Sequence, residues 1–149
     1  MKLVEASTAH AQVLAHIHGE GFAEPWSQAA LASALASPGA FALIAIDDNG
    51  EPLGFVLMRV GGGEAEVLTI ATRPPARRTG VARTLMHGAM AHVQKAGAQE
   101  VFLEVAEDNT QAQALYAALG FAQVGRRERY YGRRDDTRVA ALVMKFSFS

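Results

Sequence analysis

The order of extended and helical segments restricts the fold of this chain more than any single motif does. Three apolar stretches, residues 41–46, 53–60 and 65–72, follow one another with no helical pattern between them. Asp47–Gly50 and Gly61–Gly63 separate these stretches, and both are rich in residues that tolerate the positive φ of tight turns. The first two stretches therefore predict a β-hairpin, and the third predicts a further strand.

Helical patterns precede this block of strands and then alternate with the strands that follow it. The clearest pattern runs from Val81 to Ala96, where apolar residues recur at helical spacing and Gly97 follows as a cap. Helices alternate with strands only in this middle region, which predicts an α+β (mixed α/β) fold with a mixed sheet and helices on its faces. The predicted helices are residues 7–20, 28–36, 81–96 and 110–119, and the remaining predicted strands are 100–106, 122–131 and 137–146.

Size and composition narrow the possible functions. The chain has 149 residues, 50% of them hydrophobic, and we expect one domain over residues 1–149. A net charge of −1 gives no basic field, so no direct nucleic-acid partner is expected. The sequence contains no cysteine, which excludes a disulfide scaffold and a cysteine nucleophile. It shows neither a signal peptide nor an apolar run near the ~20 residues of a membrane helix, so we expect a cytoplasmic protein with no membrane partner.

The five histidines do not predict a metal site. His16 and His18 are two positions apart on a predicted helix, and His87 and His92 are five apart. Neither spacing places two ligands on one helical face, and no cysteine is available to complete a site. We therefore expect no metal.

A basic segment between a predicted strand and a predicted helix has the features of an anion site. Arg77-Arg78-Thr79-Gly80-Val81-Ala82 places two arginines and a glycine before the helix start, where unpaired backbone N–H groups and the helix dipole favour phosphate. It lacks both the Gly-Lys-Ser/Thr of a nucleotide P-loop and the dinucleotide Gly-x-Gly-x-x-Gly. From the residues alone, a solvated basic loop is the alternative interpretation.

Glu104 stands in the middle of the predicted strand 100–106. Strand alternation places it on the face opposite Val101, Leu103 and Val105. A carboxylate in a central strand is costly unless it is paired or used in chemistry. It is therefore a candidate general base, and the alternative is a glutamate at the open end of the strand that bonds a backbone group.

The chain resembles the GNAT acetyltransferases, which use acetyl-coenzyme A. Arg-x-x-Gly-x-Ala at residues 77–82 is similar to the family's pyrophosphate loop, and the segments that follow match its next strand and helix. Those segments are Leu103-Glu104-Val105, Asn109, Ala114-Leu115-Tyr116 and Leu119-Gly120-Phe121. Glu24-Pro25-Trp26-Ser27 and the stretch from Arg127 to Tyr131 are similar to one branch, the bacterial enzymes that acetylate the N-terminal alanine of a small-subunit ribosomal protein.

The resemblance implies a GNAT fold, with a central, mostly antiparallel sheet of about six to seven strands and helices on both faces. It also implies that strands 65–72 and 100–106 splay apart, that the pantetheine arm pairs along the former, and that a backbone N–H near Ile70 holds the thioester oxygen. The implied contacts with acetyl-coenzyme A, the co-substrate, are Ile70, Ala71, Thr72, Arg77, Arg78, Thr79, Gly80, Val81, Ala82, Arg83, Asn109, Ala112 and Tyr116.

The resemblance implies that Glu104 is the general base and that Tyr116 is the acid that protonates the leaving thiolate. A phenol, with a pKa near ~10, is a plausible donor to a thiolate whose acid has a pKa near ~8.5. Tyr116 has the alternative of packing its helix onto the sheet, and Asn109 is also a natural helix cap. Asn109 can cap its helix and contact the pantetheine arm of the coenzyme at the same time.

Four residues are expected to contact the acceptor: Trp26, Glu66, Tyr130 and Tyr131. Glu66 is a rival base or a solvated edge charge, and the two tyrosines have the alternative of cross-strand packing.

The sequence therefore predicts an N-acetyltransferase that moves an acetyl group directly, in a ternary complex, to a protein N-terminal α-amine. Two alternatives stay open, an acetyltransferase of a small amine and a non-catalytic module that binds coenzyme A. We expect a monomer or a weak dimer.

Overall fold

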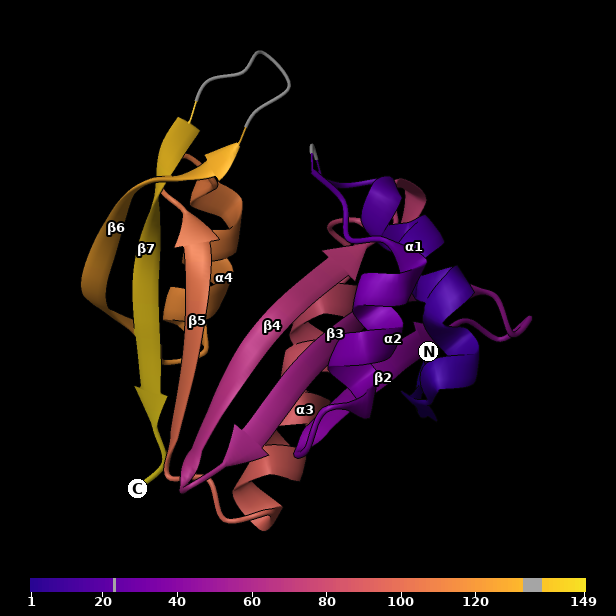
Figure 1. The fold of residues 1–149 in the computed structure, drawn as a ribbon, viewed down its shortest axis with the longest axis horizontal. Helices are drawn as coiled ribbons and strands as arrows, with labels where there is room; N and C mark the ends of the chain where they lie inside the picture. Colours follow the sequence, from indigo (N-terminus) through magenta and orange to yellow (C-terminus); the bar gives the residue numbers. More distant parts are fainter. Residues whose placement is uncertain (23, 133–137) are drawn as a thin grey trace.

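The computed structural model describes residues 1–22, 24–132 and 138–149, and it contains one seven-stranded sheet (Figure 1). The strand order is β1-β2-β3-β4-β5-β7-β6, and every neighbouring pair is antiparallel except β4 and β5. This confirms the predicted mixed, mostly antiparallel sheet. The strands are β1 (Lys2–Ala6), β2 (Ala40–Ile46), β3 (Pro52–Gly61), β4 (Glu64–Thr72), β5 (Glu100–Ala106), β6 (Ala122–Gly132) and β7 (Arg138–Ser147).

Helices cover both faces of the sheet, as predicted (Figure 1). α3 (Val81–Lys95) and α4 (Thr110–Ala118) bury residues such as Leu85, Met86 and Tyr116 in one hydrophobic cluster with β3, β4 and β5. α1 (Ala11–Gly19) and α2 (Gln28–Ala36) form a second cluster on the other face, built around Leu14 and Leu31. The strands β2 and β3 are therefore buried on both sides, which explains their continuous apolar runs.

Short polar residues and glycines fix where the helices begin and end. Ser27 accepts a hydrogen bond from the Ala30 N–H at the start of α2, and Asn109 does the same for the Ala112 N–H at the start of α4. Two short 3-10 segments, η1 (Thr8–His10) and η2 (Pro74–Ala76), were not expected. The predicted helix 7–20 is in fact η1 followed by α1, because Ser7 caps the 3-10 turn with His10 as its reciprocal partner.

The strand β1 was missed by the sequence analysis. It has only five residues, pairs with β2 alone at the edge of the sheet, and buries none of its side chains fully. An edge strand of this length has too few apolar positions to produce a recognisable alternation. Its packing is nevertheless tight, since a Cβ atom at Gly88 of α3 would lie 2.4 Å from Leu3 Cδ1.

The parallel strands β4 and β5 separate along their length (Figure 1). They pair only from Glu64 to Glu66 on β4 and from Glu100 to Phe102 on β5. The later residues of the two strands have no register partners in each other, so the strands splay apart as predicted. A register shift also interrupts the pairing of β4 with β3, between the partners of Leu57 and Met58. Such a bulge bends a strand and re-aims the side chains beyond it.

No helix in the described parts of the chain is both long enough and apolar enough to cross a membrane.

Candidate functional site: a phosphate loop beside two splayed strands

The loop between β4 and α3 has the backbone shape of an anion-binding site. Arg78 has a φ of +63° and Gly80 has a φ of +86°, so two left-handed residues lie close together just before the helix. Alternating left- and right-handed residues turn successive N–H groups toward one point, and the start of α3 adds its own unpaired N–H groups. The predicted loop residues Arg77, Thr79 and Val81 all lie within this turn.

Two side chains of the loop donate hydrogen bonds to backbone carbonyls that precede it or begin it. Thr79 Oγ1 donates a hydrogen bond to the Ala76 carbonyl at 2.5 Å, and Arg77 Nε donates to the Thr72 carbonyl at 3.3 Å. The side chains of Arg77, Arg78 and Arg83 are exposed. Cationic charge therefore surrounds a turn whose backbone N–H groups suit a pyrophosphate.

The end of β4 offers a second set of polar groups to the same ligand. Ile70, Ala71 and Thr72 pair with β3 on one side, but they lie beyond the last β5 partner on the other. Their backbone edge toward β5 can therefore accept an extended chain with amide groups as an additional strand. Pantetheine carries two such amides, so the unpaired edge and the loop together fit the shape and charge of coenzyme A. Ala82 and Ala112, the other small residues predicted to contact it, lie at the first turns of α3 and α4.

Glu104 faces away from the α3 and α4 cluster, as strand alternation predicted. Its side chain is 27% exposed, and its neighbours Leu103 and Val105 are buried on the opposite face. The carboxylate stands on the part of β5 that no longer pairs with β4. The alternative interpretation expected a hydrogen bond to a backbone group. In the described contacts, the partner of Glu104 is instead the Arg127 side chain at 2.6 Å.

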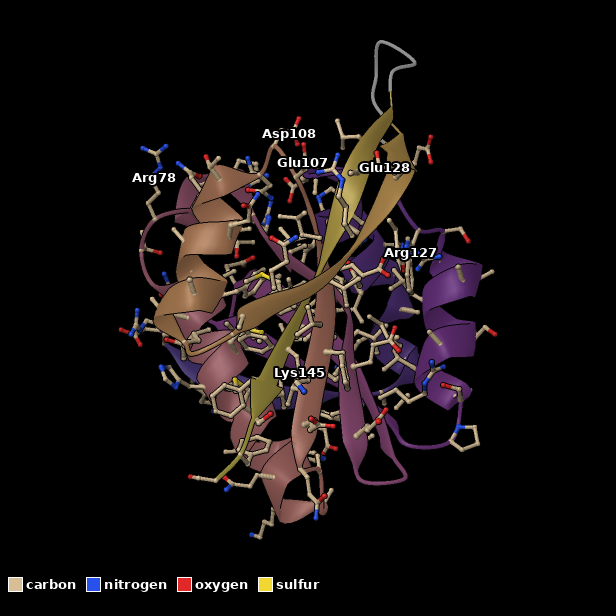
Figure 2. The ribbon with its side chains drawn as sticks, turned by 90° about the vertical axis from the view of Figure 1, so that its left-hand side faces the viewer. Arg78, Glu107, Asp108, Arg127, Glu128 and Lys145 are labelled. Carbon is tan, nitrogen blue, oxygen red and sulfur yellow. The ribbon has the colours of Figure 1, made fainter. Side chains whose placement is uncertain are left out.

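Arg127 was noted in the sequence only as the start of the stretch similar to one branch of the family, and its contact with Glu104 was not predicted. It comes from β6, two strands away from β5, and its guanidinium crosses β7 to reach Glu104. Ala141 of β7 is in register with Arg127 on one side and with Ala106 on the other, and a methyl group leaves room for this crossing. Figure 2 shows Arg78 on the α3 and α4 side of the sheet and Arg127 on the other side. The phosphate loop and this ion pair thus flank the sheet from opposite faces.

Tyr116 lies on the α3 and α4 side, where it is 5% exposed. Its ring meets the ring of Phe121 edge to face, with 5.9 Å between the centroids. Tyr116 therefore packs its helix onto the sheet, which was the alternative interpretation of this residue. Its phenol lies on the face opposite the Glu104 carboxylate. Asn109 is likewise a helix cap, as the alternative interpretation expected.

The predicted acceptor residues come from three parts of the chain. Trp26 is half-buried just before α2 and packs against the cluster beneath α1 and α2. Glu66 is exposed on β4, and its carboxylate lies 3.8 Å from the Arg59 guanidinium. Tyr130 and Tyr131 belong to β6, but their side chains lie outside what the structure describes.

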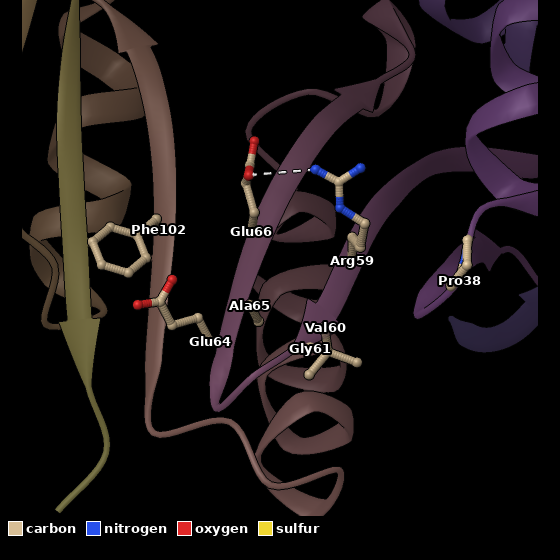
Figure 3. Close-up of a pocket in the computed structure, with 8 residues that line it drawn as sticks. All are labelled: Pro38, Arg59, Val60, Gly61, Glu64, Ala65, Glu66 and Phe102. Atoms are coloured by element: carbon tan, nitrogen blue, oxygen red, sulfur yellow. Dashed lines mark ion pairs between the residues drawn. The ribbon is translucent and has the colours of Figure 1, made fainter.

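A pocket of about 430 Å³ lies beside Glu66 (Figure 3). The carboxylates of Glu64 and Glu66, the Arg59 guanidinium and the ring of Phe102 line it. Phe102 is in register with Glu66 and precedes Glu104 by two residues on the same face of β5. Glu66 and Glu104 therefore share one face of the sheet, although Glu66 belongs to the paired half of the two strands.

Contacts of His18 and Glu20, which the sequence analysis did not predict, link the end of α1 to Trp26 and to residues 69–73. His18 accepts a hydrogen bond from the Trp26 N–H at 3.1 Å and contacts Thr69 Oγ1 at 2.9 Å. Glu20 accepts two hydrogen bonds from Arg73, at 2.9 and 3.4 Å. His18 and Thr69, and likewise Glu20 and Arg73, are more than 50 residues apart in the sequence, so only the tertiary fold brings them together.

Splayed parallel strands with a phosphate loop at their open end define a class of transferases that take an acyl group from coenzyme A. The comparison with known proteins agrees, because the model of the acetyltransferase (GNAT) family matches residues 11–121. The chain belongs to this family, and it is an acetyl-coenzyme A-dependent N-acetyltransferase.

Several relatives share one branch of the family. The [ribosomal protein bS18]-alanine N-acetyltransferase of Escherichia coli is 31% identical over 134 residues, which are 90% of this chain and 88% of that protein. The N-alpha-acetyltransferase RimI of Mycobacterium tuberculosis is 35% identical over 129 residues, with 83% and 79% covered. The crystal structure of the ribosomal-protein-S18-alanine N-acetyltransferase from Escherichia coli matches with a TM-score of 0.87 and 30% identity, over 99% of this chain and 95% of that one.

Proposed function

We propose that this enzyme acetylates the α-amine of a protein N-terminus, with Glu104 as general base and Tyr116 as general acid. The observation that carries the proposal is the position of the Glu104 carboxylate. It stands on the part of β5 that no longer pairs with β4, on the face opposite the phosphate loop, where an amine can approach the thioester from the other side. The names of the similar proteins from Escherichia coli and Mycobacterium tuberculosis support an N-terminal acceptor.

The proposed reaction is one direct transfer. Glu104 receives a proton from the acceptor ammonium, the neutral amine forms a bond to the thioester carbon, and the bond from that carbon to sulfur breaks. Tyr116 then gives its proton to the thiolate on the opposite face. The nitrogen loses its second proton as the amide forms, and through solvent this proton restores the Tyr116 phenol. An α-amine has a pKa near ~8, so it loses its proton more readily than a lysine with a pKa near ~10.4. A half-exposed carboxylate is therefore a sufficient base for an N-terminal acceptor.

Backbone groups hold the co-substrate in this proposal. The edge of β4 from Ile70 to Thr72 pairs with the pantetheine arm, and an N–H near Ile70 faces the thioester oxygen. Residues 77–83 hold the pyrophosphate, and Asn109 and Ala112 meet the arm from α4. Acetyl-coenzyme A supplies an activated thioester, so no covalent intermediate on the enzyme is needed.

A small cationic amine is the second candidate acceptor. The observation that favours it is the pocket beside Glu66, since two of its lining residues are carboxylates. Arg59 stands next to Glu66 and offsets part of that negative charge. A peptide that runs over the face from Glu104 toward Trp26 does not need this pocket. Glu66 is therefore expected to affect turnover of a small amine but not of a peptide.

The test is the release of coenzyme A thiol with two panels of acceptors, peptides with different N-terminal residues and small amines. We expect turnover of an Ala-starting peptide, with the added mass at its α-amine. Glu104→Gln should lower kcat by about 100-fold or more, whereas Glu5→Gln, an exposed glutamate on β1, should match the wild type. Turnover of small amines alone, with sensitivity to Glu66→Gln, would move the function to the second candidate. Binding of coenzyme A without turnover on either panel would contradict both.

A further inference from the structure

Two polar side chains are buried in the part of the chain that the structure describes, and they contact each other. His18, near the end of α1, is 1% exposed, and Thr69 of β4 is 8% exposed. His18 Nε2 lies 2.9 Å from Thr69 Oγ1. Buried polar groups are costly unless they are paired. A single polar pair between the apolar faces of α1 and β4 therefore indicates a specific role.

The hydrogen bonds determine which form of the imidazole is present. The Trp26 N–H can only donate, so His18 Nδ1 must accept and carries no proton. The neutral ring then carries its proton on Nε2, which donates to the Thr69 hydroxyl. Burial agrees with this neutral form, because it lowers the pKa of His18 to about 4. Both ring nitrogens are thus used, one toward each of two different segments.

Those two segments belong to the two sides of the proposed reaction. Trp26 lies on the segment between α1 and α2 and is predicted to contact the acceptor. Thr69 immediately precedes Ile70–Thr72, the unpaired edge proposed to hold the pantetheine arm. Thr69 is also opposite Leu57, where the register of β3 and β4 shifts. The imidazole links these two segments through its two ring nitrogens.

Aromatic contacts leave the ring little freedom to move. Phe22 stacks on His18 with 3.9 Å between the centroids and 8° between the ring planes, and Phe55 packs at 6.3 Å. Phe22 and Trp26 both follow α1, so the imidazole holds the first by stacking and the second by a hydrogen bond. An imidazole in this position works as a spacer of fixed length.

We propose that His18 is a positioning residue that sets the place of the acceptor segment around Trp26 relative to the unpaired edge of β4. It touches neither co-substrate nor acceptor, and it acts through Trp26 on one nitrogen and through Thr69 on the other. This inference rests on the proposed function for its effect on turnover. The placement of Trp26 itself can be measured without any reaction.

Two substitutions break the link at its two ends. His18→Gln keeps an amide that reaches toward Thr69 but loses the acceptor for the Trp26 N–H. Thr69→Val keeps the volume of the side chain but removes the hydroxyl, and Thr69→Ser restores the hydroxyl. His16→Asn is the matched control, because His16 is an exposed histidine on the same helix.

Trp26 is the only tryptophan of the chain, so its fluorescence reports the acceptor segment directly. We expect a red shift of its emission and faster exchange of its backbone amide in His18→Gln and Thr69→Val. For an Ala-starting peptide, the KM should rise about tenfold. A tenfold change corresponds to about 1.4 kcal/mol, which is within the free energy lost when a buried polar group loses its partner. The Kd of coenzyme A should stay within about twofold of the wild-type value. Thr69→Ser and His16→Asn should resemble the wild type in every measurement.

Two results would overturn the proposal. One is a folded His18→Gln whose Trp26 emission, amide exchange and acceptor KM equal those of the wild type. The other is a Kd of coenzyme A that rises as much as the acceptor KM, because His18 would then shape the sheet and not the acceptor segment. If the wild type acetylates no peptide, the proposed function fails, while the emission and exchange of Trp26 still decide whether His18 positions this segment.

Discussion

Arg127 Nη1 lies 2.6 Å from Glu104 Oε1, so the proposed general base is held by a guanidinium that reaches it from β6. The Arg127 side chain is 55% exposed and that of Glu104 is 27% exposed. An ion pair between side chains of this exposure contributes little to stability, about 1 kcal/mol at most. Its effect on the orientation of the carboxylate is therefore the more important one, because a base must face the proton that it receives.

Arg127→Met should lower kcat/KM for the acceptor by at most about fivefold. The substitution removes the orienting guanidinium but leaves the carboxylate, and up to ~1 kcal/mol of pairing corresponds to that factor. Glu104→Gln keeps an oxygen that accepts from Arg127 and removes the base, so its loss should be far larger. Steady-state kinetics of the two single variants and of the double variant measure the difference. A loss in Arg127→Met as large as that in Glu104→Gln would contradict a role limited to orientation.

Gly80→Ala should weaken the binding of coenzyme A and reduce stability by about 1 kcal/mol. The Cβ atom meets nothing within 4 Å, but the φ of +86° is strained for any residue with a side chain. Relaxing that strain turns the N–H groups of the phosphate loop away from their common point, so the Kd should rise several-fold. Gly62→Ala is a matched control, since it also has open space and a φ of +62°, but at the other end of β4. The two variants should lose similar stability, and only Gly80→Ala should lose affinity in a titration with coenzyme A.

The sequence alone predicted the parts of the site that depend on local pattern. The strand 100–106 and the helix 28–36 have the predicted bounds, because alternation, Ser27 and Pro38 mark them locally. The place of the basic turn before α3 was also predictable, since a helix start with glycine and arginine needs no distant partner, and its binding of phosphate stays a prediction. Glu104 was placed on the correct face by strand period alone.

The contacts that hold the acceptor side required the tertiary fold. His16 and His18 look alike in the sequence, and only the packing of α1 on β4 makes one exposed and the other buried. The pair of Glu104 with Arg127 depends on the register of β6, which shifts between Gln123 and Gly125 before Arg127 is reached. A shift of one residue moves a side chain to the other face, so no pattern in β6 could identify this partner.

The ion pair of Glu20 and Arg73 should make stability depend on acid and salt. The hydrogen bond from Arg73 holds the pKa of Glu20 below its ordinary value of 4.5. The contribution of the pair is therefore complete above that value and is lost as the pH falls through the lower pKa of the folded state. Arg73→Met should show a smaller fall in the urea midpoint between about pH 5 and about pH 3 than the wild type. High salt should reduce the difference between the two proteins, and a difference that salt leaves unchanged would contradict an electrostatic origin.

His18 should make the folded state less stable in mild acid than at neutral pH. Burial lowers its pKa from 6.5 to about 4, so between these values the unfolded chain binds a proton that the folded chain does not. Stability is therefore complete above about pH 6.5 and falls as the pH decreases, by about 2 kcal/mol between pH 7.5 and pH 5. His18→Gln has no proton to bind at this position, so its free energy of unfolding should change less over that range, while His16→Asn should follow the wild type. Urea unfolding of the three proteins at both pH values measures this difference, and equal slopes in all three would show that His18 accepts its proton as readily in the folded protein as in the unfolded chain.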